Sequence, residues 1–365
     1  MSLPWKKPAA PGRARTCVAI LAFLVTVVSV ASADQVAQPP APRELTIAAV
    51  GDIMLGGTAG MELVKLGYDY PFVHVGDLLR AADLTFGNLE GPLTRRGDAQ
   101  RKKYVFRSPP ELVAPALARA GFDMVSLANN HSLDYGIEGL RDTLQALEQA
   151  GVRHAGAGEN LAAARRPAFL EAAGKRIAVL AYSLTFPEEF WASDTQPGTA
   201  FGHEHHVRAD VAAARKKADI VLVSFHWGQE GSSDPRPYQR QLGRAAIDAG
   251  AAAVVGHHPH VLQGIEHYKD GVILYSLGNF VFGSYSPDAK RSAIAVLVLQ
   301  DGRVRELKLY PIDVNNFEVV FQPRLLTGPE ADAVIKQVQA LSQPLGATIE
   351  SRDGVAVLSL PKGGK

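Results

Sequence analysis

Short apolar runs recur along the chain, and each of them stops abruptly at polar residues. The runs occupy residues 45–51, 84–87, 124–128, 220–225, 251–256 and 272–278. Apolar runs of this length with such boundaries are consistent with buried β-strands. We therefore expect a buried strand at each run.

Amphipathic helical patterns lie between these runs. One predicted helix face is formed by residues spaced three and four apart, namely Ile137, Leu140, Leu144 and Leu147. Residues 238–249 predict a second helix with Gly250 as its C-terminal cap. Residues 168–180 predict a β-hairpin, because Ala173-Gly174 separates two strand-like halves. Strands that alternate with helices in this way predict an α/β fold.

The N-terminal residues differ from this pattern. Residues 1–33 combine a basic start, an uncharged apolar stretch over residues 17–31 and the small-x-small end Ala31-Ser32-Ala33, which predicts a cleaved signal peptide. An uncleaved membrane anchor is the alternative, but the stretch is shorter than the roughly 20 residues of a spanning helix. We therefore expect an exported protein, periplasmic or secreted, with no membrane span after signal removal.

The rest of the chain divides into three parts. The proline-rich residues 34–44 predict a flexible leader, and residues 45–312 form the main domain. Residues 313–365 are read as a C-terminal extension packed on the core, with a helix over residues 329–341 and a short hairpin over residues 347–360. All the apolar runs that define the core therefore fall in the main domain.

Composition narrows the class of protein. The chain is 47% hydrophobic and 21% charged, which excludes a collagen, a coiled coil or a largely disordered chain. Its 38 Lys and Arg residues balance 37 Asp and Glu residues, so no basic excess argues for a nucleic-acid partner. The one cysteine, Cys17, lies in the predicted signal peptide, so any metal must bind His, Asp, Glu or Asn.

Residue types that bind metal ions follow at least five of the predicted strands. They are Asp52, Glu90, Asn130, His226 and the cluster His257-His258-Pro259-His260. One such residue means little, because Asp and Asn are common in turns. Ligands gather beyond the carboxyl ends of strands in α/β sheets, so this series predicts a metal site. Imidazole, carboxylate and amide groups together favour Mn, Fe or Zn.

Neighbouring residues predict separate roles within such a site. His258 and His260 stand two residues apart, so an extended loop can place both on one ion pair. Asn130 can ligate a metal while His131 faces the substrate and protonates a leaving group as general acid. A hydrogen-bonded structural role is the alternative for His131. Glu230 either orients a ligand or is a solvated loop charge.

Other polar segments give weaker signals. Lys102, Lys103 and Arg107 form a basic patch that either holds an anionic substrate or is a solvated loop. Residues 203–206, His-Glu-His-His, follow no strand and predict a surface loop. The glycine-rich residues 51–60 lack the Gly-Lys-Ser/Thr end of a P-loop, which excludes that nucleotide site.

Six segments occur in the order found in a known family. They are Gly51-Asp52-Ile53-Met54-Leu55-Gly56, Asn88-Leu89-Glu90-Gly91-Pro92-Leu93, Ala128-Asn129-Asn130-His131 with Asp134-Tyr135-Gly136, Phe225-His226-Trp227-Gly228, Gly256-His257-His258-Pro259-His260 and Leu277-Gly278-Asn279-Phe280. On these residues the chain resembles the CapA family of poly-γ-glutamate capsule synthesis proteins, a branch of the calcineurin-like metallophosphatase superfamily. The resemblance covers roughly residues 45–312. It implies a four-layer αββα sandwich of two mixed β-sheets with metals at one edge.

The resemblance also implies a ligand set. The matched metal ligands are Asp52, Glu90, Asn130, His226, His258 and His260. His131 matches the non-ligand histidine of the Asn-His pair. Residues that could support a ligand or touch the substrate are His257, Glu230, Asn279 and Arg107. Met54 stands where the superfamily has a histidine ligand, and Glu90 is longer than the usual Asp, so the site is expected to hold one or two divalent ions.

Two classes of function are consistent with this reading. The first is an exported metal-dependent hydrolase that acts on a phosphoester or on an amide-linked anionic polymer in capsule metabolism. The second is a non-catalytic capsule synthesis or export factor that keeps the fold and works with the capsule synthesis machinery. Because the whole predicted ligand set and His131 are present together, catalysis is the favoured expectation.

Overall fold

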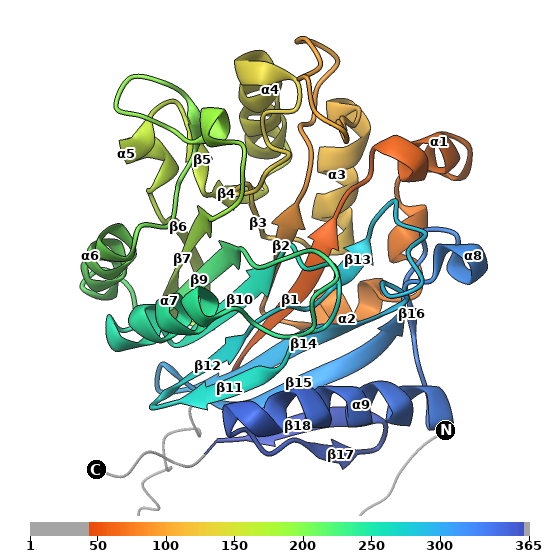
Figure 1. Cartoon of the computed structure of the whole chain (residues 1–365), viewed down its shortest axis with the longest axis vertical. Coiled ribbons are helices and arrows are strands. Elements are labelled where there is room, and N and C mark those ends of the chain that lie inside the picture. Colours follow the sequence, from red (N-terminus) through yellow and green to blue (C-terminus); the bar gives the residue numbers. More distant parts are fainter. Residues whose placement is uncertain (1–43, 361–365) are drawn as a thin grey trace, which may run out of the picture. The chain divides into compact units, whose positions relative to one another are not determined.

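The structure is a computed structural model that describes residues 44–360, and two β-sheets form its centre (Figure 1). The larger sheet has ten strands in the order β17-β18-β15-β14-β1-β2-β3-β4, with β13 paired to β1 and β16 paired to β15. Its strands are β1 (Leu45–Ile53), β2 (Leu84–Leu89), β3 (Met124–Ser126), β4 (Arg153–Ala155), β13 (Asn279–Val281), β14 (Arg291–Gln300), β15 (Arg303–Asp313), β16 (Arg324–Leu325), β17 (Glu350–Arg352) and β18 (Val355–Ser359). The sheet is mixed, because β1 is parallel to β2 and antiparallel to β14.

The smaller sheet has six strands in the order β11-β12-β10-β9-β7-β6. Its strands are β6 (Ala168–Ala172), β7 (Lys175–Ser183), β9 (Ile220–His226), β10 (Ala253–His257), β11 (Ile265–Tyr268) and β12 (Gly271–Leu274). The central strands are parallel, and β6 and β11 are antiparallel edge strands, so this sheet is mixed as well. A separate pair is formed by β5 (Ala157–Gly158) and β8 (Gly198–Thr199).

Nine α-helices occur within the described residues, and most of them cover the outer sheet faces. They are α1 (Gly57–Leu66), α2 (Gly76–Ala81), α3 (Pro110–Ala120), α4 (Gly136–Gln149), α5 (Leu161–Ala164), α6 (Glu204–Arg215), α7 (Pro237–Asp248), α8 (Asn316–Val319) and α9 (Gly328–Ser342). Within residues 44–360, none of these helices combines the length and the apolar character that crossing a bilayer requires.

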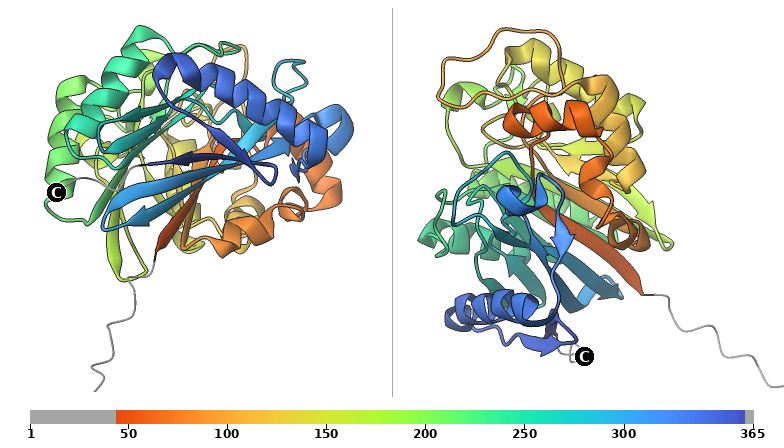
Figure 2. Two further views of the ribbon diagram at one scale, coloured as in Figure 1. Left: turned by 90° about the horizontal axis from the view of Figure 1, so that it is seen from below. Right: turned by 90° about the vertical axis from the view of Figure 1, so that its right-hand side faces the viewer.

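The layers are held together by three apolar cores. The first fills the space between the sheets, where Ile47 of β1 and Leu222 of β9 belong to one buried cluster. The second lies between the larger sheet and helices α1–α4, and the third between the smaller sheet and helices α6 and α7. Figure 2 shows helices on the outer sides of the sheets. Strands buried on both faces need apolar residues throughout, which explains why the sequence shows unbroken apolar runs. The four-layer sandwich expected from the sequence is therefore confirmed.

The predicted local elements are present with shifted ends. The hairpin is β6 and β7, joined by a turn in which Ala173 and Gly174 have positive φ. The two predicted helices are α4 and α7. The predicted helix and hairpin near the C-terminus are α9 and the β17–β18 pair. The predicted signal peptide and nearly all of the leader lie outside the described residues.

Residues 272–278 differ from the prediction of one strand. Strand β12 ends at Leu274, and the chain then crosses from the smaller sheet to the larger one, where β13 begins at Asn279. Gly278 has φ +74°, a left-handed conformation that favours glycine and interrupts a strand. The crossing matters for the site, because it places Asn279 opposite Asp52 of β1.

Residues after 312 complete the larger sheet and the core. Strand β18 pairs with β15 along the residues from Leu309 to Glu306. Helix α9 contributes Ala331, Val334 and Val338 to the core between the sheets. Figure 1 shows this helix beneath the strands, at the end of the molecule away from the loops that follow β1, β2 and β9. The C-terminal residues therefore stabilise the sandwich at a distance from those loops.

Candidate metal centre

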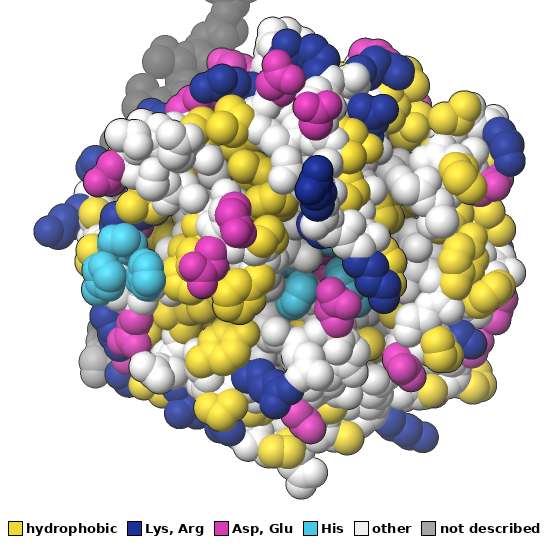
Figure 3. All heavy atoms as spheres, turned by 45° about the horizontal axis from the view of Figure 1, so that its top comes forward, with side chains coloured by type: hydrophobic (Ala, Val, Ile, Leu, Met, Phe, Trp, Pro, Cys, Tyr) yellow, Lys and Arg dark blue, Asp and Glu magenta, His cyan; other side chains and the backbone are white. Residues whose placement is uncertain are grey.

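The candidate site lies where carboxyl ends of strands from both sheets meet. Strands β1, β2 and β3 are parallel in the larger sheet, as are β9 and β10 in the smaller one, so the ends of each set lie at one edge. The strand register pairs Asp52 with Asn88 and His226 with His257. Figure 3 shows histidine side chains in a hollow near the centre of this face, with basic and acidic side chains beside them. We call Asp52, Glu90, His226, His258 and His260 the strand-end cluster.

Asp52 is the buried anion of this cluster. Its side chain is fully buried and accepts hydrogen bonds from Asn88 Nδ2 at 2.9 Å and from the backbone N of His258 at 3.2 Å. His260 Nδ1 lies 3.0 Å from Asp52 Oδ2, and His257 Nδ1 lies 3.5 Å from Oδ1. Burial alone would raise the pKa of Asp52, but these two imidazoles hold that pKa well below its usual value. Asp52 is therefore an ionised carboxylate.

Glu90 is a buried carboxylate with an unused oxygen. Its Oε1 accepts a hydrogen bond from Asn88 Nδ2 at 3.3 Å, whereas Oε2 is buried without a hydrogen-bond partner. Burial and the negative charge of Asp52 raise the pKa of Glu90 well above its usual value. Two buried carboxylates that disfavour each other's ionisation are stabilised by a cation between them. One ligand atom each of Asp52, Glu90 and His226 lies within 4.8 Å of the others, which fits such a cation.

The buried imidazoles are available as neutral ligands. Burial lowers the pKa of His226 well below its usual value, and burial together with the charge of His260 lowers the pKa of His258 to about 3. The two rings lie 4.6 Å apart between centroids, and His258 Nδ1 is buried without a hydrogen-bond partner. Neutral imidazole is the form that binds transition metals. The donor set therefore fits Mn, Fe or Zn.

His260 carries the opposite charge state. Burial lowers its pKa, but the contact with Asp52 and the charges of Glu90 and Asp52 outweigh burial and raise it to about 9. Its Nδ1 also lies 2.9 Å from Asn279 Oδ1. Because a metal ligand must release its proton, binding of a cation at His260 is coupled to proton release.

His131 lies beside the cluster and is held in one orientation. Its Nδ1 is 2.8 Å from Asp134 Oδ2, and Asp134 is fully buried. Lys102 Nζ lies 2.5 Å from the other oxygen of Asp134 and 3.1 Å from His131 Nδ1, and it donates to the carbonyl of Asn130. Nε2 of His131 then lies 3.9 Å from Glu90 Oε2. Burial lowers the pKa of His131, although Asp134 opposes that shift. The free edge of the ring therefore faces the cluster.

The structure places the remaining predicted residues at different distances from the cluster. Asn130 Oδ1 lies 2.7 Å from His226 Nε2, and neither ring nitrogen of the buried His257 has a hydrogen-bond partner. Glu230 lies beside His258 and His260. Arg107 is exposed, and its guanidinium lies over the Tyr135 ring at 4.5 Å, with no contact to the cluster recorded among residues 44–360.

Four further residues of the centre were not predicted as part of a metal site, although Lys102 was predicted within a basic patch; they are Asn88, Asn129, Lys102 and Asp134. Asn88 Nδ2 reaches Asp52, Glu90 and also His226 Nδ1, the last at 3.2 Å. Asn129 Nδ2 donates to Asn88 Oδ1 at 3.1 Å and so fixes the orientation of the Asn88 amide. The sequence does contain a signal for Asn88. Residues two apart on a strand point to the same face of the sheet, and Asn88 precedes the predicted ligand Glu90 by two positions.

The fold and the site together define an α/β sandwich with a buried carboxylate–imidazole cluster at its strand ends. The sequence profile described as "Bacterial capsule synthesis protein PGA_cap" matches residues 46–284. The chain therefore belongs to this family of bacterial capsule synthesis proteins.

Named relatives support the assignment to the family. The chain is 36% identical over 311 residues to the capsule biosynthesis protein CapA of Bacillus anthracis, covering 81% of this chain and 76% of that protein. It is also 36% identical over 273 residues to the PGA biosynthesis protein CapA of Bacillus subtilis (strain 168), covering 74% and 72%. Among solved structures, the NAD nucleotidase of Haemophilus influenzae is similar with a TM-score of 0.47 and 11% identity, covering 82% of this chain and 63% of that one.

Proposed function

We propose that this protein is an exported metal-dependent hydrolase that acts on a phosphoester or on an amide-linked anionic polymer in capsule metabolism. The observation that carries the proposal is the strand-end cluster, in which the buried Glu90 Oε2 and His258 Nδ1 have no hydrogen-bond partner. Buried polar groups are nearly always satisfied, so unpartnered ones that each belong to a group of potential metal ligands are best explained by a ligand such as a cation. The printed names of the relatives, which concern capsule and PGA biosynthesis, supply the metabolic setting.

The residues that would hold the metal are Asp52, Glu90, Asn130, His226, His258 and His260. A bound divalent ion would supply Lewis acidity and a water of lowered pKa, chemistry that none of these side chains provides. The chain's own contribution is to orient the ligands. Asn88 positions both carboxylates, and the neutral imidazole of His258 has an Nδ1 without a hydrogen-bond partner, whereas both nitrogens of His226 are engaged by Asn88 and Asn130.

His131 is the proposed proton donor to the leaving group. Asp134 and Lys102 hold Nδ1, so Nε2 is the nitrogen that faces the reacting group. The ring also packs against Phe106 at 4.7 Å between centroids, which restricts its rotation. A general acid fixed in this way transfers its proton along one direction, and such groups typically contribute about 10²–10⁴-fold to turnover.

A non-catalytic capsule factor is the second candidate, and Met54 favours it. Met54 is buried at the position where the resemblance predicts a histidine ligand. A thioether is a poor ligand for Mn, Fe or Zn compared with imidazole. A protein that had lost one metal ligand could keep the fold as a scaffold for the capsule machinery.

The test combines metal analysis with a screen of phosphoester and γ-glutamyl substrates on the chelator-treated and metal-loaded protein. We expect metal-dependent turnover in the wild type. His131→Ala should keep its metal content and melting temperature but lose about 10²–10⁴-fold in kcat. Asn130→Ala should lose metal and activity together. Unchanged turnover in His131→Ala would show that His131 is not the general acid. The absence of metal-dependent turnover with any substrate would favour the non-catalytic capsule factor.

Export is part of the same proposal and rests on the composition of residues 1–33. We expect the mature chain to begin at Asp34. N-terminal sequencing of the exported protein checks this, and an intact Met1 in the membrane fraction would contradict cleavage.

A further inference from the structure

The strand-end cluster lacks the ligand that position 54 would supply. The side chain of Met54 is buried, and its Cε lies within 3.6 Å of the positions where a Cβ would stand on Gly57 and on Gly283. This methyl group therefore packs against the start of α1 and the loop after β13. A fourth protein ligand for the metal near His260 has to come from another element.

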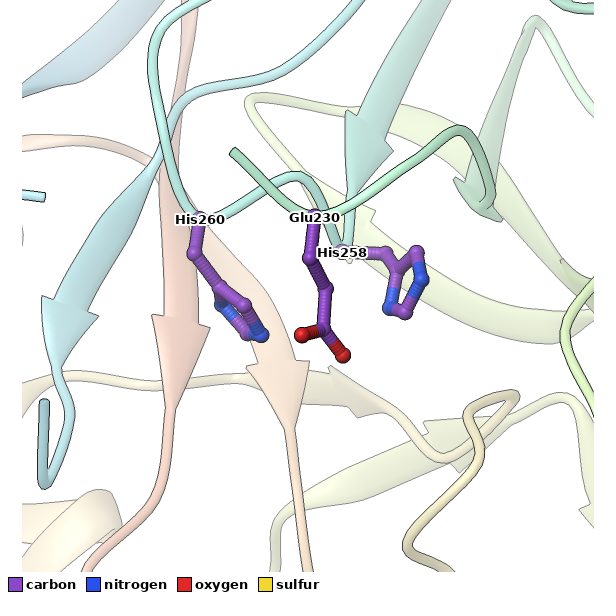
Figure 4. A group of neighbouring side chains, drawn as sticks. All are labelled: Glu230, His258 and His260. Carbon is purple, nitrogen blue, oxygen red and sulfur yellow. The ribbon is translucent and has the colours of Figure 1, made fainter. Parts of the chain in front are cut away.

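Glu230 lies where such a ligand is needed. It belongs to the loop between β9 and α7, and one ligand atom each of Glu230, His258 and His260 lies within 4.8 Å of the others. Figure 4 shows the Glu230 carboxylate between the two imidazole rings, with all three side chains directed to the same side. This group adjoins the deeper one, because His260 Nδ1 is 3.0 Å from Asp52 Oδ2.

The backbone around Glu230 is tied to the loop that carries the two histidines. Gly231 N donates to the carbonyl of Pro259, the residue between His258 and His260, at 2.9 Å. On the other side, Gly228 N donates to Tyr238 Oη at 2.7 Å. The position of Glu230 relative to the imidazoles is therefore set by hydrogen bonds on both sides of it.

The Glu230 carboxylate has no competing partner. Among residues 44–360, the structure records no hydrogen bond or ion pair for its oxygens, although Lys103 and His260 are close enough to interact with its charge. A carboxylate that merely oriented His258 or His260 would accept a hydrogen bond from one of the rings, and none is recorded. A free carboxylate aimed at two imidazoles is a ligand set that suits Mn, Fe, Co or Zn.

We propose that Glu230 is a metal ligand that, together with His258 and His260, completes the metal position for which Met54 provides no donor. The inference rests on the proposed metal centre and concerns the same site. It assigns coordination to a side chain that the family resemblance leaves outside the ligand set. The exposed carboxylate is the outermost of these ligands, so the metal it binds faces the solvent and the substrate.

The first experiment measures metal binding without turnover. Zn²⁺ and Mn²⁺ are titrated calorimetrically into the chelator-treated mature protein, its Glu230→Gln variant and the control Asp234→Asn, which removes a negative charge from an exposed position in the same loop. We expect Glu230→Gln to lose one bound ion or to weaken one site by more than about a hundredfold, the upper end for residues that only support a ligand. Asp234→Asn should bind as the wild type does.

The second experiment reads coordination directly. Because Cys17, the one cysteine of the sequence, precedes the proposed mature start at Asp34, Glu230→Cys places a single thiolate at position 230 of the mature protein. With Co²⁺ as the probe, a ligand at this position should give a thiolate-to-cobalt charge-transfer band in the near ultraviolet. Asp234→Cys should give no such band. Melting curves in chelator show whether each variant is folded.

The outcomes separate this inference from the function. If Glu230→Gln binds Zn²⁺ and Mn²⁺ as the wild type does and Glu230→Cys gives no cobalt band, Glu230 is not a ligand, while the metal centre stands. If the wild type binds no metal, both the centre and this inference are wrong. If metal binds through Glu230 but no substrate is turned over, the inference stands and the hydrolase proposal fails.

Discussion

Two histidine clusters on this molecule differ in almost every property that decides metal binding. The strand-end cluster combines imidazoles with buried carboxylates at the ends of β1, β2, β9 and β10. The other, the surface cluster, lies at the start of α6 on the edge of the same face (Figure 3) and consists of His203, His205 and His206. Its rings are as close as 4.1 Å between centroids, closer than the 4.6 Å between His226 and His258. Crowding of histidines is therefore not what distinguishes the two clusters.

The state of the nearby carboxylates distinguishes them. Next to the surface cluster, Glu204 accepts hydrogen bonds from Arg208 at 2.7 Å and from Gln241 at 2.8 Å. Asp210 is paired with Arg165 and also accepts from Tyr182. In the strand-end cluster, by contrast, Glu90 Oε2 is buried and unpartnered. A carboxylate that is already paired with an arginine is less available to bind a metal ion.

Ligand geometry shows the same difference. Among the described residues, the groups whose ligand atoms lie within 4.8 Å of one another are Asp52–Glu90–His226 and Glu230–His258–His260. The surface histidines form no such group. A histidine-rich segment thus indicates a metal site only where the fold adds uncommitted carboxylates, and the following predictions test this conclusion.

The largest expected effect is the loss of metal-dependent stability. A metal that binds only the folded state should stabilise the wild type by about 2.7 kcal/mol when free metal is a hundredfold above its dissociation constant. His258→Ala combined with His260→Ala should abolish most of this gain, whereas His203→Ala combined with His205→Ala should leave it intact. Melting curves with and without chelator measure the difference. A wild-type melting temperature that does not respond to chelator would refute the centre.

The next largest effect concerns the amide that holds the two carboxylates. Asn88→Ala removes the donor shared by Asp52 and Glu90 and leaves buried acceptors unpaired, which costs about 1–3 kcal/mol of unfolding free energy. Urea denaturation in the presence of chelator measures this cost. Asn130→Ala is the matched control, because Asn130 is only partly buried and should cost less. Equal stability of Asn88→Ala and the wild type would mean that the carboxylates do not depend on this amide.

The pH dependence of stability is the third prediction. His260 has a pKa of about 9 in the folded chain and about 6.5 when unfolded, so the folded state binds more protons between these values. Stability without metal should therefore fall as pH rises from about 6.5 to 9. With saturating metal, this decline should disappear, because the metal-bound imidazole and the unfolded imidazole are both deprotonated over most of this range.

Urea midpoints at several pH values in chelator check this prediction. Asp52 and Glu90 face His260, and Lys102, whose pKa burial lowers, adds a slope of opposite sign. Comparison with His260→Gln isolates the histidine, since that variant keeps the other groups. A wild-type profile that parallels the variant's would contradict the raised pKa of His260.

The comparison also shows what the sequence could and could not predict. The strands were predictable because both faces of each are buried, which leaves unbroken apolar runs such as residues 220–225. The cluster was predictable because parallel strands bring their carboxyl ends to one edge. The end of the strand within residues 272–278 could not be predicted, because the chain changes sheets after Leu274 and turns at Gly278.

The residues missed at the site depend on tertiary contacts. Lys102 contacts Asp134 and His131 from a loop about thirty positions earlier in the chain, and no local sequence pattern predicts that contact. Asp134 follows His131 by three positions. An Asp at such a position is typical of a turn, and only the structure shows that its side chain is fully buried. From the sequence, Glu230 could equally be a solvated charge, because its position opposite the imidazoles depends on the tertiary hydrogen bonds of Gly231 and Gly228.

The smallest expected effect tests the surface cluster itself. Glu204 lies in the first turn of α6, where a negative charge is favourable, and its ion pair with Arg208 is largely exposed. Exposed pairs of this kind contribute about 0.2–1 kcal/mol, so Glu204→Gln should lower the free energy of unfolding by no more than that, and less at high salt. The loss should be the same with chelator and with Zn²⁺, because Glu204 is committed to Arg208 and Gln241 rather than to a cation. Urea denaturation in chelator and in Zn²⁺, each at low and at high salt, measures this loss of unfolding free energy. Glu230→Gln is the contrasting variant, whose loss of unfolding free energy should appear only with metal. If Glu204→Gln destabilised the protein only in Zn²⁺, the surface cluster would be a cation site as well, and the distinction between committed and uncommitted carboxylates would fail.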